Sequence, residues 1–211
     1  MFIPNYYNQN KYMLKIYVGP MYSGKTTELI RNYNRYRKYK QIIIDFDTNF
    51  DNNKKKPVIE LESNLYYYVD NLCNHNKQEI ECLKISNINI LEQFYIQNLD
   101  IIKDVKIIHI NEGQFFQDLK HVVINLLEKY NINIYIYGLD GDFKREKFGE
   151  IMDLVPYCDS ITKLKGVCDS CDNNALFSYR ICYGDQQMLF NDSFEDKYIP
   201  LCRKCYIQKI I

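Results

Sequence analysis

The sequence predicts an α/β fold, in which helices flank a parallel sheet, followed by a small cysteine-rich unit. Three observations carry this prediction. Short apolar runs alternate with helical stretches, an order typical of parallel strands joined by crossover helices. The first apolar run is followed at once by the glycine-rich segment GPMYSGKTTEL, where a helix should begin. After residue 168 the pattern changes to short apolar pieces between two cysteine pairs.

The individual elements follow from the apolar runs and the polar breaks between them. Residues 51–57 (DNNKKKP) form a polar loop, and residues 58–104 mix short apolar runs with asparagine and charge, so no element is assigned there. The run 161–168 (ITKLKGVC) is expected to be the last core strand. The other strands are predicted at residues 13–18, 41–45, 105–111 and 132–141 (the last with its turn), and helices at residues 25–39 and 116–130.

The overall composition disfavours several classes of protein. The 211 residues, 46% of them hydrophobic, suffice for one domain with a small appendage, and 27 basic residues balance 27 acidic ones. A neutral chain carries no broad positive field for nucleic acid or anionic lipid. No segment approaches the roughly 18 uncharged apolar residues of a membrane span, and the N-terminus lacks the order of a signal peptide. We therefore expect a cytoplasmic protein with neither nucleic-acid nor membrane partners.

Two local features have a plain interpretation. The basic and aromatic stretch RNYNRYRKYK (31–40) would suit a nucleic-acid patch, but a solvated helix face is favoured. The three histidines lie in a polar stretch (His75), an apolar strand (His109) and a helix (His121), and structural or solvent roles are expected for all three.

Residues 19–26 (GPMYSGKT) match the pattern G-x-x-x-x-G-K-[ST] of phosphate-binding loops. Glycines let backbone N–H groups turn inward around an anion, and the following helix presents its positive end to the same oxygens. Lys25 would reach the β- and γ-phosphates, and Thr26 would place its hydroxyl on Mg²⁺. The alternative is an ordinary glycine turn with an exposed lysine. The preceding strand and the following helix favour a P-loop NTPase-like sheet.

A second candidate site lies where the run IIHINEGQFF ends an apolar strand with Asn111 and Glu112. In this fold class ligands gather at the carboxyl ends of the strands. A carboxylate at this place can act as a general base that accepts the proton of an attacking alcohol. The alternative is a surface glutamate, which is common after a strand.

Two cysteine pairs, Cys168-x-x-Cys171 and Cys202-x-x-Cys205, are separated by the 30 residues 172–201. Such pairs usually offer four thiolates to one tetrahedral zinc ion, and a site closed by four protein ligands is structural. In small zinc peptides the metal contributes about 10–16 kcal/mol of folding free energy. The alternatives are unrelated thiols or a redox pair. Small buried apolar roles are expected for Cys73, Cys82, Cys158 and Cys182.

Three segments in order, GPMYSGKTTEL, NEGQFF and LDGDFKREKFGEIMDLVP, resemble the thymidine kinase family of the tetrameric, zinc-containing type. With the cysteine pairs, the resemblance spans residues 16–206. It implies ATP-dependent transfer of phosphate to the 5′-hydroxyl of thymidine in nucleotide salvage, with Mg²⁺ and structural zinc. It also implies a homotetramer, with a dimer as the alternative.

The resemblance further implies a domain organisation. We expect a flexible tail over residues 1–12, a P-loop α/β nucleotide-binding domain over 13–167, and a zinc-anchored domain over 168–211. In the last of these, the chain between the cysteine pairs would form a lasso over the nucleoside base. A lid of this kind would exclude water from the reaction.

Roles for individual residues follow from the same resemblance. Glu112 matches the catalytic base, Thr26 and Asn111 match the Mg²⁺ positions, and Arg180 matches an arginine of the family pattern whose role here is open. On their own, the apolar nucleoside candidates would be taken for core residues. The residues implied for ATP and its phosphates are Gly19, Met21, Tyr22, Ser23, Gly24, Lys25, Thr26, Thr27 and Asp47. The residues implied for the nucleoside are Met21, Phe115, Leu139, Phe143, Phe148, Ser178 and Tyr198.

Three positions depart from the family pattern. The family usually has aspartate where Asn111 stands, so Mg²⁺ binding should be weaker, and Asn111→Asp should tighten the Mg²⁺ dependence. After Asp47, Asn49 replaces the usual arginine and cannot neutralise phosphate charge. The segment 189–198 (LFNDSFEDKY) lacks a glycine pair that is often found there, which weakens the expectation of thymine specificity.

These departures raise a second hypothesis, a kinase-like binding or regulatory protein with little turnover. The presence of Lys25, Thr26 and Glu112 favours the active kinase. A third hypothesis, a zinc-ribbon nucleic-acid module, is disfavoured because the ribbon is not basic enough and the phosphate loop would be unused.

Overall fold

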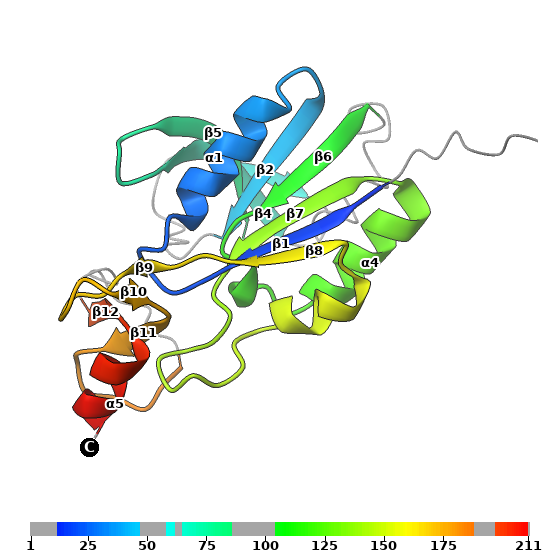
Figure 1. Cartoon of the computed structure of the whole chain (residues 1–211). Coiled ribbons are helices and arrows are strands. Elements are labelled where there is room, and N and C mark those ends of the chain that lie inside the picture. Colours follow the sequence, from blue (N-terminus) through cyan, green and yellow to red (C-terminus); the bar gives the residue numbers. More distant parts are fainter. Residues whose placement is uncertain (1–11, 47–57, 62–64, 86–103, 188–196, 211) are drawn as a thin grey trace, which may run out of the picture.

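The computed structural model describes residues 12–46, 58–61, 65–85, 104–187 and 197–210 (Figure 1). Within these residues an eight-stranded sheet runs in the order β3-β4-β5-β2-β6-β7-β1-β8. The six strands from β5 to β8 in this order are parallel, whereas β3 and β4 add to one end as antiparallel strands. The α/β class predicted from the sequence is confirmed. The strands are β1 (Leu14–Val18), β2 (Lys40–Phe46), β3 (Val58–Leu61), β4 (Leu65–Cys73), β5 (Glu79–Ile85), β6 (Val105–Ile110), β7 (Asn133–Gly138) and β8 (Ser160–Lys163).

Helices cover both faces of the sheet (Figure 1). Helix α1 (Lys25–Arg35) packs on one face with Tyr135 and Tyr137 of β7. Helix α4 (Leu119–Tyr130) and the 3₁₀ helix η2 (Ile151–Tyr157) pack on the other face with Ile134 and Ile136 of the same strand. The near-continuous apolar character of β7 therefore reflects burial on both faces, as is usual for a central parallel strand.

Two predicted helices are shorter than the sequence suggested. Helix α1 ends at Arg35 instead of residue 39, because Tyr36 leaves the helical region and the chain must turn before β2 begins at Lys40. Helix α4 begins at Leu119 instead of residue 116. The chain before it forms a separate 3₁₀ turn, η1 (Gly113–Phe115), followed by an extended residue at Phe116.

The expectation of a last core strand over residues 161–168 is wrong. That run divides into β8, which pairs only with β1 at the described edge of the sheet, and β9 (Gly166–Val167), which belongs to a different sheet. All four residues of β8 (SITK) are exposed, and Ile161 is its one apolar residue. The sequence pattern alone did not distinguish an edge strand from a buried one.

The strands in residues 58–104 had no firm sequence signal. In β5 the alternation Glu79-Ile80-Glu81-Cys82 is the period-2 pattern of a strand with one buried face. Strand β4 pairs with it antiparallel through a short turn at residues 74–78, so these strands form a hairpin beside β2. This hairpin brings its turn to the pocket described below.

A small C-terminal unit follows β8 and lies beside the carboxyl end of β1 (Figure 1). It contains two two-stranded sheets, β9–β10 and β11–β12, and a terminal helix. Its core joins three cysteines, Cys168, Cys202 and Cys205, to Ala175, Leu201 and Tyr206. The elements not yet given are β10 (Asn174–Ala175), β11 (Phe177–Arg180), β12 (Tyr198–Leu201) and α5 (Arg203–Ile210).

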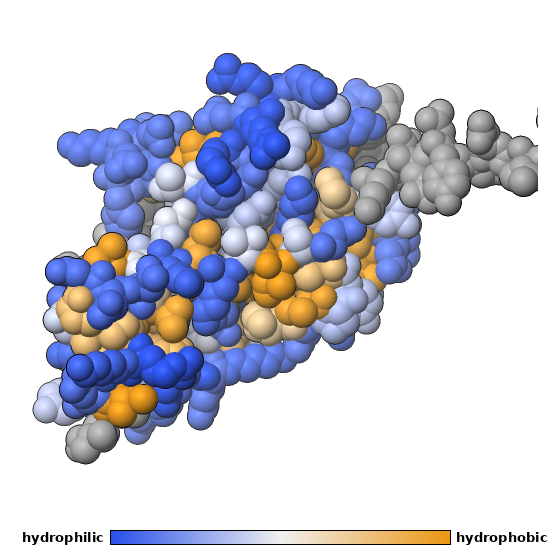
Figure 2. All heavy atoms as spheres, in the orientation of Figure 1, coloured by the Kyte–Doolittle hydropathy of each residue, from blue (hydrophilic) through white to orange (hydrophobic). Residues whose placement is uncertain are grey.

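The surface differs between α1 and the sheet edge. In the orientation of Figure 1, the outward face of α1 is hydrophilic, in agreement with the solvated helix face expected for its basic end (Figure 2). Apolar side chains gather instead near β8, where Ile161 is 41% exposed. No helix in the described ranges is long and apolar enough to cross a bilayer.

Candidate active site

The loop of residues 19–24 joins β1 to α1 and has the geometry of an anion-binding nest. Tyr22 (φ 61°) and Gly24 (φ 81°) have left-handed backbone, which turns neighbouring N–H groups to one side. Gly24 is the N-cap of α1 and provides no side-chain cap. The N–H groups of the first helical turn are therefore available to an anion.

Lys25 is buried, and its side chain folds back onto the same loop. Its Nζ donates hydrogen bonds to the carbonyl oxygens of Pro20 (2.8 Å) and Gly19 (3.3 Å). Burial lowers the pKa of Lys25, while the negative charges of Glu112 and Asp140 act in the opposite direction. A buried ammonium group gains from an anionic partner, so this position favours the binding of phosphate.

A pocket of about 550 Å³ opens between the loop, the carboxyl ends of β2 and β6, and the turn of the β4–β5 hairpin. It unites the candidates for phosphate, metal and catalysis. It also includes part of the set proposed for the nucleoside. The lining comprises Met21, Tyr22, Ser23, Gly24, Lys25, Thr26, Thr27, Asp45, Phe46, Leu72, Cys73, Asn74, His75, Lys84, Asn111, Glu112, Gln114, Phe115 and Leu139.

Glu112 lies two residues after the end of β6 and adopts left-handed backbone (φ 50°), which is uncommon outside glycine and concentrates at functional sites. Its Oε2 accepts a hydrogen bond from Nε2 of the buried Gln114 at 2.6 Å. Oε1 of Gln114 accepts one from the backbone N–H of Leu139 at 3.0 Å, so Gln114 ties the carboxylate to the end of β7. Burial raises the pKa of Glu112, while Lys25 and Gln114 act to lower it. A constrained carboxylate with a raised pKa suits a general base.

Three polar side chains, Lys84, Asp45 and Asn111, contact one another at the ends of the neighbouring strands β5, β2 and β6. Asp45 accepts a hydrogen bond from Nδ2 of Asn111 on Oδ1 (2.8 Å) and pairs with Lys84 through Oδ2. Asp45 and Asn111 are each 3% exposed. Asp45 and Lys84 were not among the site residues predicted from the sequence. Asp45 could have been found, since it ends the apolar run QIIID as Glu112 follows IIHI; Lys84 lies in the stretch where no element was assigned.

An aromatic wall closes one side of the pocket. The ring of Phe115 lies 5.1 Å from that of Phe46 and 5.5 Å from that of Phe148, the latter in an edge-on arrangement. Phe148 therefore supports Phe115 from behind and is itself absent from the described lining. Leu139, which is 9% exposed, borders the same space.

Three other nucleoside candidates have partners of a different kind and do not belong to the described lining. Ser178 is buried, and its Oγ accepts a hydrogen bond from the backbone N–H of Met21 (2.9 Å), so it holds the phosphate loop. Tyr198 accepts hydrogen bonds on its hydroxyl from Nε (3.0 Å) and an Nη (2.6 Å) of Arg180. The guanidinium of Arg180 also lies 3.7 Å from the ring centre of Phe143. Arg180 thus joins the C-terminal unit to the loop after β7.

The remaining predictions fall in different places. Asp47 lies outside the described residues. His109 is fully buried and contacts Tyr137 and Gln41, and burial lowers its pKa to about 3, which agrees with a structural role. His75 instead lines the pocket, where its ring lies 5.4 Å from that of Tyr22, a position that the sequence analysis did not foresee.

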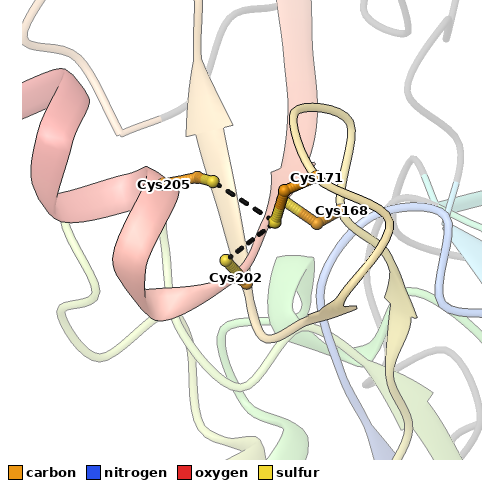
Figure 3. A group of neighbouring side chains, drawn as sticks. All are labelled: Cys168, Cys171, Cys202 and Cys205. Carbon is orange, nitrogen blue, oxygen red and sulfur yellow. Dashed lines mark hydrogen bonds between the residues drawn. The ribbon is translucent and has the colours of Figure 1, made fainter.

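The four cysteines of the two pairs converge on one point (Figure 3). Their Sγ atoms all lie within 4.8 Å of one another, with 3.6 Å between Cys171 and Cys202 and 3.4 Å between Cys171 and Cys205. None of the eight cysteines forms a disulfide. Tetrahedral zinc with bonds of about 2.3 Å requires sulfur separations of roughly 3.8 Å, so the four thiols could hold a metal ion such as zinc.

A mainly parallel sheet, with a nest at a helix N-terminus, a buried lysine and a carboxylate lining one pocket, is typical of α/β proteins that bind nucleotides. A family model described as thymidine kinase matches residues 12–206. The chain belongs to the thymidine kinase family.

Individual relatives agree with this assignment. A thymidine kinase of Variola virus is 33% identical over 196 residues, which are 92% of this chain and 96% of the relative. A thymidine kinase of Vaccinia virus (strain Western Reserve) is 32% identical over 197 residues, with the same coverage. A thymidine kinase of Oryza sativa subsp. japonica is 28% identical over 194 residues, which are 92% of this chain and 66% of that longer relative.

Proposed function

We propose that the chain transfers the γ-phosphate of ATP to the 5′-hydroxyl of thymidine, in the salvage of DNA precursors. The observation that carries this proposal is that the phosphate loop and Glu112 line one pocket. The distance between a bound γ-phosphate and an attacking alcohol is short, so the anion site and the base must face the same space. Membership of the thymidine kinase family supports thymidine as the alcohol.

The phosphates are assigned to the loop, with Gly19, Met21, Tyr22, Ser23, Gly24, Lys25, Thr26, Thr27 and Asp47 as the binding residues. Burial of Lys25 and the free first turn of α1 support this assignment. A further support is the Oγ of Ser23, a buried atom without a hydrogen-bond partner, as expected for a group that meets a phosphate oxygen.

Thr26 and Asn111 are assigned to the Mg²⁺ that accompanies ATP. The fit is supported by Oδ1 of Asn111, a buried acceptor without a hydrogen-bond partner, and by the place of Thr26 in the same lining. Both offer oxygen, the ligand atom that Mg²⁺ prefers, directly or through bound water. When bound, Mg²⁺ would neutralise charge on the phosphates.

Glu112 is assigned the role of general base. Its carboxylate would accept the proton of the 5′-hydroxyl as the oxygen attacks the γ-phosphate, and Lys25 would stabilise the charge on the transferred group. The hydrogen bond from Gln114 and the left-handed backbone hold the carboxylate in place. A raised pKa brings the base closer to the working pH, which increases its affinity for the proton.

The nucleoside is assigned to Met21, Phe115, Leu139, Phe143, Phe148, Ser178 and Tyr198. Met21, Phe115 and Leu139 border the pocket directly. Phe148 supports the ring of Phe115, Ser178 bonds the backbone of Met21, and Arg180 joins Tyr198 to Phe143, so the support for these four is indirect. These four therefore act mainly by shaping the pocket.

Zn²⁺ is assigned to Cys168, Cys171, Cys202 and Cys205 as a structural ion. It would anchor residues 168–211 as a unit separate from the nucleotide-binding domain at 13–167, with residues 1–12 as a tail. Since Ser178 and Tyr198 lie between the two cysteine pairs, a metal at their base would fix the segment that reaches Met21.

Self-association into a homotetramer, or a dimer, is part of the proposal. The exposed edge strand β8 and the apolar surface near it support an interface of some kind, since unpaired strand edges seldom stay uncovered. Light scattering coupled to size-exclusion chromatography would give the number of chains. The cytoplasmic location expected from the sequence stays a prediction.

The experiment for the function is steady-state phosphate transfer from ATP by zinc-replete protein, with thymidine, deoxyuridine and deoxycytidine compared side by side. We expect turnover with thymidine well above the nucleoside-free background, and its loss in Glu112→Gln with thymidine binding intact. No transfer, with ATP and thymidine still bound, would favour the alternative of a catalytically weak regulatory protein. Unchanged turnover in Glu112→Gln would remove Glu112 as the base.

A further inference from the structure

The side chains of Asp45 and Asn111 form a direct contact at the centre of the pocket wall. The backbone N–H of Asn111 donates to the carbonyl of Ile44 at 2.7 Å, which holds the ends of β2 and β6 together. Nδ2 of Asn111 then donates to Oδ1 of Asp45 at 2.8 Å. Both residues are 3% exposed, and both line the pocket.

This contact determines which way the amide of Asn111 points. A carboxylate only accepts hydrogen bonds, so Asp45 must face the NH₂ group of Asn111 and not its oxygen. The amide oxygen Oδ1 is therefore turned away from Asp45. It is buried and has no hydrogen-bond partner, an arrangement that proteins generally avoid unless a ligand or bound water completes it.

Asp45 also carries the negative charge that residue 111 lacks. Its Oδ1 accepts a second hydrogen bond from the N–H of Phe46 (3.1 Å), and its Oδ2 pairs with Nζ of Lys84. Lys84 comes from β5 and lines the same pocket. The contacts with Phe46 and Lys84 thus fix the position of the Asp45 carboxylate, and the carboxylate in turn fixes the amide of Asn111.

We propose that Asp45 and Asn111 act as one metal-binding unit, in which Asp45 supplies the charge and orients the amide, and Asn111 Oδ1 accepts a hydrogen bond from water bound to Mg²⁺. Asp45 is a positioning residue in this unit, because it acts through the amide of Asn111. The inference rests on the proposed function only in requiring that a metal–nucleotide complex enters the pocket.

The unit changes the expectation for residue 111. From the sequence, Asn111→Asp should tighten the Mg²⁺ dependence. In the structure the new carboxylate would lie about where Nδ2 now lies, 2.8 Å from Oδ1 of Asp45. Two carboxylates at this distance repel, and they would compete for Lys84. We therefore expect Asn111→Asp alone to weaken Mg²⁺-dependent binding, and Asp45→Asn with Asn111→Asp to restore it by exchanging the charge and the amide.

The test is calorimetric binding of ATP to the full-length protein without nucleoside, once with saturating Mg²⁺ and once with EDTA. The dissociation constant in EDTA divided by that in Mg²⁺ measures how much the metal strengthens ATP binding. A general loss of stability does not change this ratio. Changes beside a metal ligand typically reduce metal affinity about 10–100-fold, so the ratio should fall by about this factor in Asp45→Asn and in Asn111→Asp. The double variant should return to within about threefold of the parent protein, if coupling accounts for the single losses.

Asp140→Asn is the matched control. Asp140 is another carboxylate whose charge acts on Lys25, but its partner is Lys163 and not Asn111. It removes one negative charge near the site and should leave the Mg²⁺ ratio nearly unchanged. A similar fall in Asp140→Asn would mean that general charge, and not the unit, sets the metal affinity.

Two further results would overturn the inference: an unchanged ratio in Asp45→Asn, or a larger ratio in Asn111→Asp alone. Thermal unfolding checks that each variant folds. If Asp45→Asn does not fold, Asn111→Asp still decides the question, because the inference requires weaker and not tighter metal binding. Failure to phosphorylate thymidine would refute the proposed function without affecting these binding ratios.

Discussion

Gly149 tests the support beneath Glu112 most directly. It has left-handed backbone (φ 62°), and a Cβ at this position would lie 2.2 Å from the backbone oxygen of Gln114 and 2.9 Å from its Cα. Left-handed backbone destabilises a non-glycine residue by roughly 1–2 kcal/mol, and overpacking typically adds about 1–3 kcal/mol. Gly149→Ala should therefore lower the free energy of unfolding by about 2–5 kcal/mol, or the Tm by about 4–20 °C in a chain of this size.

The collision should also reach the active site. The backbone of Gln114 cannot move without carrying its side chain, which bonds Glu112 at 2.6 Å and the N–H of Leu139 at 3.0 Å. Displacement of the base by a fraction of an ångström reduces the rate of phosphate transfer. We therefore expect Gly149→Ala to lower kcat for thymidine more than it weakens ATP binding, as measured by steady-state kinetics and calorimetry.

Gly184→Ala is the matched control for this prediction. Gly184 also has a positive φ (136°), but a Cβ there meets no atom within 4 Å. Gly184→Ala introduces backbone strain but no steric collision, so its Tm should fall while its kcat stays unchanged. Equal losses of Tm and unchanged kcat in both variants would refute the reasoning that Gly149 makes room for Gln114.

Three further predictions concern the base, the metal and the loop. Burial raises the pKa of Glu112 above its ordinary value of 4.5, so kcat should fall as the pH is lowered through that raised pKa. The folded state also binds this proton more tightly than the unfolded state. The contribution of Glu112 to stability is therefore fully present below pH 4.5 and is lost as the pH rises through the folded pKa. Glu112→Gln should therefore abolish turnover yet raise the Tm at neutral pH, and an unchanged Tm would contradict the burial argument. Metal analysis should find one zinc per chain. Removal of the zinc by a chelator, or Cys202→Ser, should unfold the C-terminal unit and weaken thymidine binding more than ATP binding, since zinc contributes about 10–16 kcal/mol of folding free energy in small zinc peptides. An equal loss of affinity for both ligands would argue for global unfolding. Ser178→Ala should leave the partly buried N–H of Met21 without its acceptor and lower stability by about 0.5–1.5 kcal/mol. Ser178→Thr keeps the hydroxyl and should behave like the parent in denaturant titrations.

The amino-acid sequence by itself determined the parts of the site that depend on local spacing. The glycines and Lys25 of the phosphate loop lie within eight consecutive residues, so their relation is set by one turn between a strand and a helix. The spacing within each cysteine pair is likewise local, and two such pairs in one chain are typical of a zinc site. Glu112 could be named because it follows an apolar strand, and strand ends meet at one edge of a parallel sheet.

Only the tertiary structure decided which side chains from distant segments meet. Lys84 lies in β5, Asp45 lies in β2 and Asn111 follows β6, so their contact depends on the strand order β5-β2-β6. The order also made β8 an edge, although its sequence suggested a core strand. The physical reason is that hydrogen bonds between strands are the same for any neighbour, so a local pattern states that a strand forms but not which strand lies beside it. Ser178 shows the same limit, since its partner Met21 lies 157 residues away.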